Sequence, residues 1–501
     1  MDQLISYCLI STLFFLLLLL KLKTNSKPSL RLPPGPWTLP ILGSIHHLIG
    51  SLPFRVLRDL SQQHGGLMFL QLGEQPTVVI SSPELAREIM KVHDATFATR
   101  NPTITVKILT YYGKDVAFTP YGDYWRQVRK ICILELLSLK RVQSFRSIRE
   151  EETVNLIELI SSLSGDGKLI NLSDKIFSTI NDMSFRAVVG NKCKNQDIFL
   201  RELQKAFDLA SGFNLVDLFP SSYLVSLMSG AAREATRCHR ELDQLLDAMI
   251  EEHRNRKGGA DEVEDLLGVL LRLYDEDPEQ LARNMDAVKA VIFDAFAASS
   301  ETTAAVVDWA MFELMRSPLV MKKVQSEIRQ LLQGQANITD LDLVKLNFLH
   351  LVIKETLRLH PPFPLLLPRE CRETCCIFGY DIPQGATVIV NAWAIGRDPK
   401  YWKDAEEFKP ERFIDGSSDA DFKGMNFEFI PFGAGHRICP GMSFGLANIE
   451  IVLANLLYHF DWELPAGVHP KELDTVESYG LSARKKADLI LRAIPHVTTS
   501  K

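Results

Sequence analysis

The sequence offers little that would cross-link the chain. Its eight cysteines are scattered and form no Cys-x-x-Cys pair. Only Cys371, Cys375 and Cys376 lie close together, and two adjacent cysteines are poor geometry for chelating zinc. A disulfide framework is therefore not expected, and the pattern is typical of reduced thiols in a protein that faces the cytosol.

The sequence also lacks a strong charge of either sign, a linker and a repeat. The formal net charge is -6 over 501 residues, and this mild acidity argues against a nucleic acid as a partner. Length alone allows two to four domains, but no Gly/Ser-rich linker, low-complexity segment or internal repeat marks a boundary. With 46% hydrophobic residues, the chain has ample material for a large core.

One long hydrophobic run stands at the N-terminus. Residues 4–20 carry no charge and end in a run of leucines, which reaches the short end of the range for a membrane-spanning helix. Lys21 and Lys23 follow the run while only Asp2 precedes it, so the positive-inside rule places the amino terminus in the lumen. A cleaved signal peptide is the alternative, but no A-x-A cleavage site follows. We expect residues 1–23 to be an uncleaved membrane anchor.

A stretch rich in basic residues and proline follows the anchor. Residues 32–36 (LPPGP) and then Pro40 disfavour a helix and favour extended backbone. A PxxP-type ligand has a similar composition, but a position directly after an anchor suits a stiff strut that orients the body against the bilayer. We expect residues 24–44 to form this hinge and residues 45–501 to form the body.

The clearest chemical motif is a glycine-rich loop around one cysteine. Cys439 lies in residues 432–441 (FGAGHRICPG), directly before the apolar, helix-like run 442–457. Backbone N–H groups in the turns and the positive end of the helix favour a thiolate. Arg437 adds a cation that can pair with an acidic cofactor group. The alternative is a buried structural cysteine in a glycine-rich turn, the common fate of a single cysteine.

The spacing within this loop resembles the haem-binding loop of the cytochrome P-450 monooxygenases. The residues that carry the resemblance are Phe432, Gly435, Arg437, Cys439 and Gly441. It implies that the loop holds a haem b and that Cys439 is the axial thiolate ligand of the iron, the ligand that favours O–O cleavage. It also implies the cytochrome P-450 fold, mainly α with small β-sheets, preceded by one transmembrane helix.

The longest apolar helix pattern, residues 286–315, carries a second motif of the same family. Within it lie residues 298–303 (ASSETT), and a carboxylate in an apolar helix is costly unless it is paired or used. The resemblance implies that Thr302 holds dioxygen or a water and that Glu301 relays protons. A cap-like cluster that faces solvent is the alternative, and the large apolar residues on both sides argue against it.

Ser299 is the one departure from the family's pattern in this motif, because it stands where glycine is usual. We expect the Ser299 hydroxyl to bond the carbonyl of Ala295 and to bend the helix in the way a glycine kink would. The departure concerns the shape of the pocket more than the type of reaction.

Trp125 and Arg129 lie four residues apart at the start of a long helical pattern, so they share one helix face. An indole N–H and a guanidinium there can bind one carboxylate, and the family uses this Trp-x-x-x-Arg pair on the haem propionates. An ordinary amphipathic helix with a solvated arginine is the alternative. Arg126, Lys130 and Arg141 would form a basic patch for an acidic electron donor, although a charge run is usually a solvated face.

Glu355 and Arg358 lie three residues apart in an apolar helical segment. A surface pair at this spacing is weak, but the apolar surroundings indicate burial, and a buried pair needs further partners. Arg412, in residues 408–413 (FKPERF), is the candidate third member. The three resemble the family's Glu–Arg–Arg triad, which locks the segment beneath the haem. The resemblance also implies a propionate contact for Arg369.

The resemblance covers almost the whole chain in order and implies an apolar substrate pocket. The residues expected to line it are Ile104, Ile108, Phe118, Phe213, Phe293, Phe296, Ala297, Phe363 and Leu481. No cation for a carboxylic substrate is evident among them. This composition suits a mono-, sesqui- or diterpene, while phenolic and oxime-derived substrates stay open.

We therefore expect an NADPH-dependent monooxygenase that looks most like the plant microsomal A-type members, many of which oxidise terpenes. A separate NADPH–cytochrome P-450 reductase would supply electrons, and the catalytic domain would face the cytosol from the endoplasmic reticulum membrane. Two alternatives stay open. One is a haem-thiolate rearrangement enzyme that needs neither dioxygen nor reductase, against which Glu301 and Thr302 speak, and the other is a non-catalytic membrane haem carrier.

Overall fold

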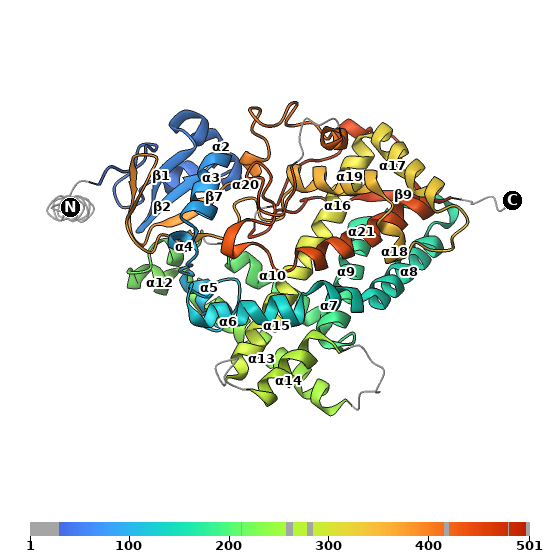
Figure 1. Cartoon of the computed structure of the whole chain (residues 1–501), viewed down its shortest axis with the longest axis horizontal. Helices are drawn as coiled ribbons and strands as arrows, with labels where there is room; N and C mark the ends of the chain where they lie inside the picture. Colours follow the sequence, from blue (N-terminus) through green and yellow to red (C-terminus); the bar gives the residue numbers. More distant parts are fainter. Residues whose placement is uncertain are drawn as a thin grey trace, which may run out of the picture.

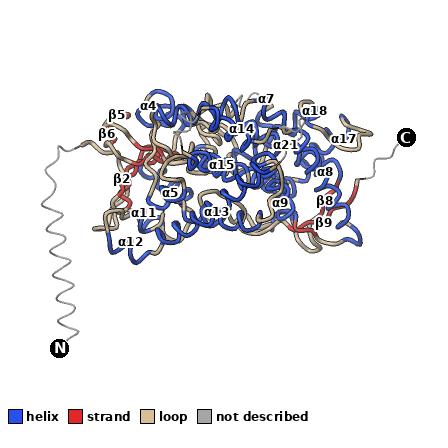
Figure 2. The backbone as a smooth tube through the Cα atoms, turned by 90° about the horizontal axis from the view of Figure 1, so that it is seen from below, coloured by secondary structure: helices blue, strands red, loops and turns tan. Residues whose placement is uncertain are grey.

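The computed structural model describes residues 30–211, 213–256, 264–277, 284–414, 420–478 and 480–496. The predicted anchor, residues 1–23, lies outside these ranges, and so does the first part of the hinge. Helices predominate, and small sheets lie toward the two ends of the molecule (Figure 1, Figure 2). The expectation of a mainly helical fold with small β-sheets is confirmed. The described cysteines form no disulfide.

The elements have the following bounds. The α-helices are α2 (Pro53–His64), α3 (Pro83–Arg87), α4 (Asp94–Phe97), α5 (Ile104–Leu109), α6 (Asp123–Ile131), α7 (Leu139–Ser144), α8 (Arg146–Leu163), α9 (Leu172–Val189), α10 (Gln196–Leu209), α11 (Leu215–Leu218), α12 (Tyr223–Ser229), α13 (Ala231–Asn255), α14 (Leu266–Glu276), α15 (Met285–Ser299), α16 (Glu301–Arg316), α17 (Pro318–Leu331), α18 (Asp340–Leu343), α19 (Asn347–Leu359), α20 (Ala392–Ile395) and α21 (Met442–His459). The strands are β1 (Leu67–Leu72), β2 (Gln75–Ile80), β3 (Ile170–Asn171), β4 (Arg369–Glu370), β5 (Cys375–Ile377), β6 (Tyr380–Ile382), β7 (Thr387–Val390), β8 (Phe460–Glu463) and β9 (Ile490–Pro495).

The largest sheet has four strands in the order β1–β2–β7–β4. β1 and β2 form an antiparallel hairpin, and β7 pairs in parallel with β2, with Thr387 opposite Thr77. The strands β3, β9 and β8 form a second sheet, and β5 and β6 form a separate hairpin. Directly after β2, the hydroxyl of Ser82 accepts the N–H of Leu85 and caps α3.

Residues 101–118, for which the sequence indicates no regular element, contain the short helix α5. Thr103 is its N-cap, and the Thr103 hydroxyl accepts the N–H of Val106. A helix of barely more than one turn is too short to show a hydrophobic period, so the sequence pattern missed it.

The helix α16 runs through the middle of the molecule and contacts α9, α19 and α21 (Figure 1). Almost all of its residues are buried, and Trp309 and Phe312 are among the largest fully buried side chains. Together with α15 it forms a stretch, Met285–Arg316, that is long and apolar enough to cross a membrane, but 72% of its apolar window is buried inside the protein. The stretch is therefore the central core element of the described chain.

The helix that the sequence predicts over residues 286–315 is broken near its middle. α15 ends at Ser299, Ser300 has φ −77° and ψ −76°, and α16 begins at Glu301. The break lies within the acid–threonine motif, so the motif residues stand where the helix backbone departs from its regular path.

The cause of the break is not the one that the sequence predicts. The Ser299 hydroxyl is buried and has no hydrogen-bond partner among the described residues, so the predicted bond to the Ala295 carbonyl is wrong. The hydroxyl of Thr302 donates instead to the carbonyl of Ala298 at 2.5 Å, one turn back. Back-bonding by a hydroxyl does occur at the break, but it comes from the threonine.

We predict that Gly35→Ala loosens the hinge from the body. A Cβ atom at Gly35 would lie 2.0 Å from the carbonyl oxygen of Phe69, beside the hydrogen bond that the Phe69 N–H donates to Pro34 at 2.9 Å. The clash should lower the free energy of unfolding by about 1–3 kcal/mol, as overpacking does, and should expose residues 30–44 to hydrogen exchange. Gly165→Ala, where an added Cβ meets no atom within 4 Å, is the matched control. Unchanged protection in Gly35→Ala would contradict the prediction.

Candidate active site

An apolar cavity of about 320 Å³, called here the central cavity, lies between the broken helix α15–α16 and the glycine-rich loop. Of the residues singled out in the sequence motifs, those that line it are Trp125, Arg129, Ser299, Thr302, Arg369, Phe432, Arg437, Cys439 and Gly441. These residues come from segments that lie hundreds of positions apart in the sequence, and the tertiary structure brings them to one place.

Cys439 lies three residues before the start of α21, and its N–H donates to the Phe432 carbonyl at 2.9 Å. Burial raises the pKa of the Cys439 thiol. The N–H of Gly441 and the guanidinium of Arg129 lower the pKa, as expected for a thiolate-favouring loop, but burial outweighs them. A thiolate at this position therefore needs a further positive charge beside the sulfur, of the kind that a bound metal ion supplies.

Gly435 shows why the loop contains glycine. Its φ is +68°, and an added Cβ would lie 2.1 Å from the Met90 carbonyl oxygen and 2.2 Å from a carboxylate oxygen of Asp94. The next residue, His436, donates its N–H to Asp94 at 2.6 Å. Asp94 also pairs with Arg369 at 3.0 Å, so this carboxylate ties the loop to the cavity wall.

Four buried arginine side chains surround part of the central cavity: Arg100, Arg129, Arg369 and Arg437. Burial lowers the pKa of each guanidinium. Arg437 and Arg369 lower the pKa of Arg100 further, and burial with Arg369 beside it lowers that of Arg437 to about 9. Buried positive charges at this density favour an anionic ligand in the cavity.

The hydrogen bonds of these guanidinium groups end mainly on neutral carbonyl oxygens. Arg437 donates to Ala98 at 2.7 Å and to Val116 at 3.2 Å. Arg100 donates to Leu367 at 2.5 Å, and its Nε is buried without a partner among the described residues. Carbonyl oxygens satisfy N–H donors but do not cancel their charge, so the demand for an anion persists.

Trp125 and Arg129 lie on α6 and both line the central cavity. The Trp125 indole N–H donates to the Val116 carbonyl at 3.1 Å, and Arg129 donates to the Ile438 carbonyl. The guanidinium of Arg437 lies 4.2 Å from the centre of the Trp125 ring. The two residues that the sequence places on one helix face thus converge on the loop and the cavity.

The predicted basic patch is smaller than the sequence indicates. Arg126 is exposed and pairs with Asp123 of its own helix, and Lys130 is exposed. Arg141 turns away: it donates to the Glu264 carbonyl at 2.8 Å. The patch therefore consists of Arg126 and Lys130, because Arg141 is used to hold the segment before α14.

Thr302 lines the central cavity, whereas Glu301 does not. One carboxylate oxygen of Glu301 lies 3.7 Å from the Arg484 guanidinium, and the other is buried without a partner among the described residues. Burial raises the pKa of Glu301, and the Ser482 hydroxyl and Arg484 lower it only in part. The acid and the alcohol of the motif are neighbours in sequence, but the acid faces the C-terminal loop.

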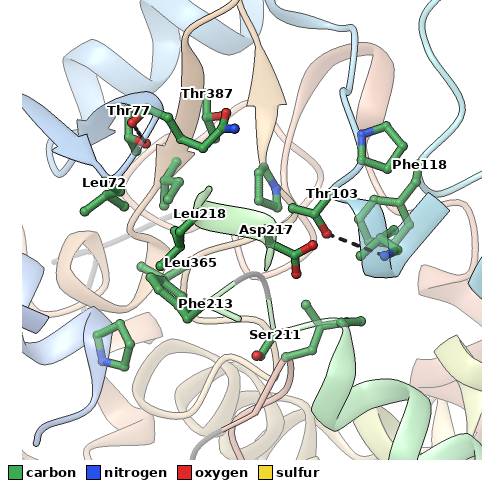
Figure 3. Close-up of a pocket in the computed structure, with 18 of the residues that line it drawn as sticks. Leu72, Thr77, Thr103, Phe118, Ser211, Phe213, Asp217, Leu218, Leu365 and Thr387 are labelled. Carbon is green, nitrogen blue, oxygen red and sulfur yellow. Dashed lines mark hydrogen bonds between the residues drawn. The ribbon is translucent and has the colours of Figure 1, made fainter. Parts of the chain in front are cut away.

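The predicted pocket residues divide between two adjoining cavities. Those that line the central cavity are Phe118, Phe293, Ala297, Phe363 and Leu481. Ile104 and Phe213 line a second cavity of about 220 Å³, formed by the four-stranded sheet, α5 and α11 (Figure 3). Phe118 and Leu481 line both cavities, so the two adjoin at these side chains.

Two predicted pocket residues lie elsewhere. Phe296 is fully buried and packs against Phe185 and Phe199, with ring centres 4.6 Å and 4.8 Å away. Ile108 packs against the same hydrophobic cluster and lines neither cavity. Neither residue therefore lines the cavities in which the other predicted pocket residues lie. For Phe296 the reason is that a helix turns by about 100° per residue, so its side chain points to a different side than that of its neighbour Ala297.

Glu355, Arg358 and Arg412 form one buried ionic cluster. The Arg358 Nη2 lies 2.8 Å and the Arg412 Nε 2.9 Å from the same Glu355 oxygen, and the side chains of Glu355 and Arg358 are 0% exposed. Arg358 also donates to the carbonyls of Gly396 at 2.6 Å and Ala405 at 2.7 Å. The cluster therefore cross-links α19 with the irregular segment between α20 and Arg412.

Sequence reasoning missed two residues of the cavity, Asp294 and Arg100. Asp294 supplies the one carboxylate among the described residues that line the central cavity. The sequence does contain a signal for Asp294. It precedes Glu301 by seven residues, or two helical turns, so the two acids share one side of an apolar helical pattern. Arg100 had no such signal, because nothing in a single arginine of an irregular segment shows that it becomes buried.

Comparisons with known proteins agree over nearly the whole chain. Residues 33–491 match the family model described as cytochrome P-450. The chain is 48% identical to the 5-epiaristolochene 1,3-dihydroxylase of Nicotiana tabacum, with 97% of each chain covered. It is 49% identical to the desmethyl-deoxy-podophyllotoxin synthase of Sinopodophyllum hexandrum, with 98% of this chain and 97% of that one covered. A zebra fish cytochrome P-450 solved with abiraterone has a TM-score of 0.74 at 25% identity, covering 89% of this chain and 99% of that chain.

We predict that Glu355→Ala lowers the free energy of unfolding by about 3–5 kcal/mol. The substitution removes the carboxylate that neutralises the buried guanidinium groups of Arg358 and Arg412. Denaturant unfolding followed by circular dichroism measures the change. Glu411→Ala is the matched control: Glu411 adjoins Arg412 but pairs with Lys323 near the surface, so it should cost at most about 1 kcal/mol. Equal effects of the two substitutions would contradict a special role for the buried cluster.

We predict that Glu301→Gln stabilises the protein increasingly as the pH rises. The raised pKa of Glu301 means that the folded protein binds this proton more tightly than the unfolded chain. The wild type should therefore lose stability relative to Glu301→Gln from about pH 4.5, the ordinary glutamate pKa, upward through the raised pKa, and the difference should then level off. Unfolding titrations of both proteins across this interval measure it, and a difference that does not depend on pH would refute the assignment.

Proposed function

Because the chain belongs to the cytochrome P-450 family, we propose that it is an NADPH-dependent haem-thiolate monooxygenase that hydroxylates an apolar terpenoid. The observation that carries the proposal is that Cys439 and Thr302 line one apolar cavity. The family and the fold imply a haem iron as the cofactor.

The residues of the central cavity fit a haem. A haem joins a flat apolar ring to two carboxylates, and the cavity joins apolar walls to buried guanidinium groups, one of which keeps an unpartnered Nε. We propose that Cys439 ligates the iron and that Phe432 and Gly441 shape the loop around the sulfur. The groups that would hold the propionates are Trp125, Arg129, Arg369 and Arg437, with Arg100 as a further contact. Bound haem iron supplies the activation of dioxygen.

Thr302 and Glu301 are the proposed proton-handling residues. The Thr302 hydroxyl lies on the cavity wall and now donates to the Ala298 carbonyl at 2.5 Å, so a turn of its side chain presents the same proton to the cavity. The raised pKa of Glu301 means that it keeps its proton to a higher pH than an exposed glutamate does, which suits a group that donates protons. Its neighbour Arg484, with a side chain 40% exposed, links Glu301 to solvent, from which the proton is replaced.

The proposed substrate is a terpenoid, because most of the side chains that line the central cavity are apolar and one relative is named as a 1,3-dihydroxylase of 5-epiaristolochene. A phenolic substrate is the second candidate. It is favoured by the relative named desmethyl-deoxy-podophyllotoxin synthase, which is similar to this chain to the same degree.

The proposed partner is a separate NADPH–cytochrome P-450 reductase, which would dock against the exposed cations of Arg126 and Lys130. We further propose that residues 1–23 anchor the protein in the endoplasmic reticulum membrane and that residues 24–44 form the hinge. Residues 45–501 then form the catalytic domain on the cytosolic side. The hydrogen bond from Phe69 to Pro34 supports a hinge that is fixed to the body at its far end.

Turnover with a plant reductase and NADPH tests the proposal. Terpene hydrocarbons, terpene alcohols and phenylpropanoids are offered as one mixture, and mass spectrometry shows which compound gains oxygen. A hydroxylated terpene supports the proposal, and an oxidised phenylpropanoid alone replaces the substrate class. An isomerised product formed without NADPH would favour a rearrangement enzyme. A thiolate-type haem spectrum with no product from any compound would favour a haem carrier.

We predict that Thr302→Ala uncouples turnover: the variant consumes NADPH but releases more peroxide than product, because the cavity has lost a hydroxyl donor. The peroxide-to-product ratio should rise by about 100-fold, the lower end of the usual contribution of one proton-transfer group. Thr302→Ser keeps the hydroxyl and should restore coupling. Tight coupling in Thr302→Ala would remove Thr302 from the mechanism.

A further inference from the structure

Asp294 is a partly buried acid that the proposed mechanism does not use. It lies on α15, and its carboxylate is the one acidic group among the described residues that line the central cavity. Both of its hydrogen bonds end on one oxygen, Oδ2, which accepts the N–H of Val116 at 2.7 Å and the N–H of Ala117 at 3.1 Å. Asp294 therefore holds two consecutive backbone amides of the segment that leads to Phe118.

The segment 114–119 is fixed from several sides, and Phe118 is its one residue that lines both cavities. Asp115 accepts the N–H of Phe118 at 2.9 Å, within the segment. From α6, the Tyr124 hydroxyl donates to the Lys114 carbonyl at 2.8 Å. Two links run from the segment to α15, which forms the opposite wall. Lys114 pairs with Asp286 near the start of that helix, and Asp294 holds the two amides directly before Phe118, so Asp294 sets how far this part of the segment stands from α15.

The position of Asp294 is energetically costly, which indicates a use. Burial and the neighbouring Asp115 raise the pKa of Asp294 well above its ordinary value. Its hydrogen-bond partners are backbone amides, and no lysine or arginine forms an ion pair with it in the described part of the chain. Desolvation of a carboxyl group in such surroundings costs more free energy than two hydrogen bonds from backbone amides return. Stability alone therefore does not explain why the carboxyl group is here.

We propose that Asp294 is a positioning residue for the substrate: by holding the amides of Val116 and Ala117, it sets the place of Phe118 where the two cavities adjoin. Phe118 in turn decides which carbon of an apolar substrate faces the reacting centre. The proposal rests on the proposed monooxygenase function for its effect on products. Its structural half, the clamp on the segment, does not depend on that function.

Two substitutions of Asp294 separate the clamp from the charge. Asp294→Asn keeps an oxygen that accepts the same two N–H groups, whereas Asp294→Ala removes the acceptor. Asp286→Asn is the matched control, because Asp286 lies on the same helix and pairs with Lys114 of the same segment at 2.6 Å without lining either cavity. All variants are made in the full-length protein with haem bound.

Hydrogen exchange of the amides in the segment 114–119 tests the clamp directly. Asp294→Ala should lower the protection of Val116 and Ala117 by about tenfold or more, which corresponds to about 1.4 kcal/mol. Asp294→Asn and Asp286→Asn should leave the protection of these two amides within twofold of the wild type. Unchanged protection in Asp294→Ala would overturn the proposal.

A double-mutant cycle with Phe118→Ala tests whether Asp294 acts through that ring. With 5-epiaristolochene as the probe, Asp294→Ala alone should raise KM by about tenfold and shift the ratio of hydroxylated positions, with kcat changed by less than threefold. In the Phe118→Ala background the same substitution should change neither by more than twofold. Independent, multiplicative effects would overturn the proposal.

The same double-mutant cycle can be measured by ligand binding, without turnover. The dissociation constant of 4-phenylimidazole, an azole that ligates haem iron from the cavity and is followed by haem absorbance, should rise about tenfold in Asp294→Ala and not further in the double variant. If the wild type forms no product from 5-epiaristolochene, the proposed terpenoid substrate fails while this cycle still decides the role of Asp294. Equal binding to the wild type and Asp294→Ala would overturn that role.

Discussion

The buried positive charge around the central cavity is the constraint on which the rest of the site depends. The guanidinium groups of Arg100, Arg129, Arg369 and Arg437 lie in the interior, and their hydrogen bonds go largely to carbonyl oxygens. Such charges are tolerated only where an opposite charge completes them. A haem with two propionates is a ligand that meets this demand and also fills an apolar cavity beside a cysteine.

The broken central helix organises the site in a second way, through three carboxylates that follow one another at intervals of seven residues. Asp294 holds the amides that lead to Phe118. Glu301 faces Arg484 of the C-terminal loop. Asp308 accepts the Ser173 hydroxyl at 2.6 Å. Each acid ties a different segment to the same helix, so the helix that forms the cavity wall also fixes the distance of the other walls.

The structure brings together many of the residues that the sequence motifs single out. Cys439, Thr302 and the arginines of the motifs line one cavity, and Glu355 forms one buried cluster with Arg358 and Arg412. The pocket was predicted less well. Phe293 and Phe296 are equally apolar, but one lines the cavity and the other packs against α9 and α10, since hydrophobicity alone does not say which surface a side chain covers.

By itself, the sequence determined the family, the apolar central segment and a set of candidate site residues, because these depend on residue types at fixed local spacing. Only the tertiary structure decided which oxygen or nitrogen each of them faces. The turn of Glu301 away from the cavity, the use of Arg141 on Glu264 and the clamp of Asp294 all depend on contacts between segments far apart in the chain. Such contacts are set by the packing of whole elements, and local spacing carries no information about it.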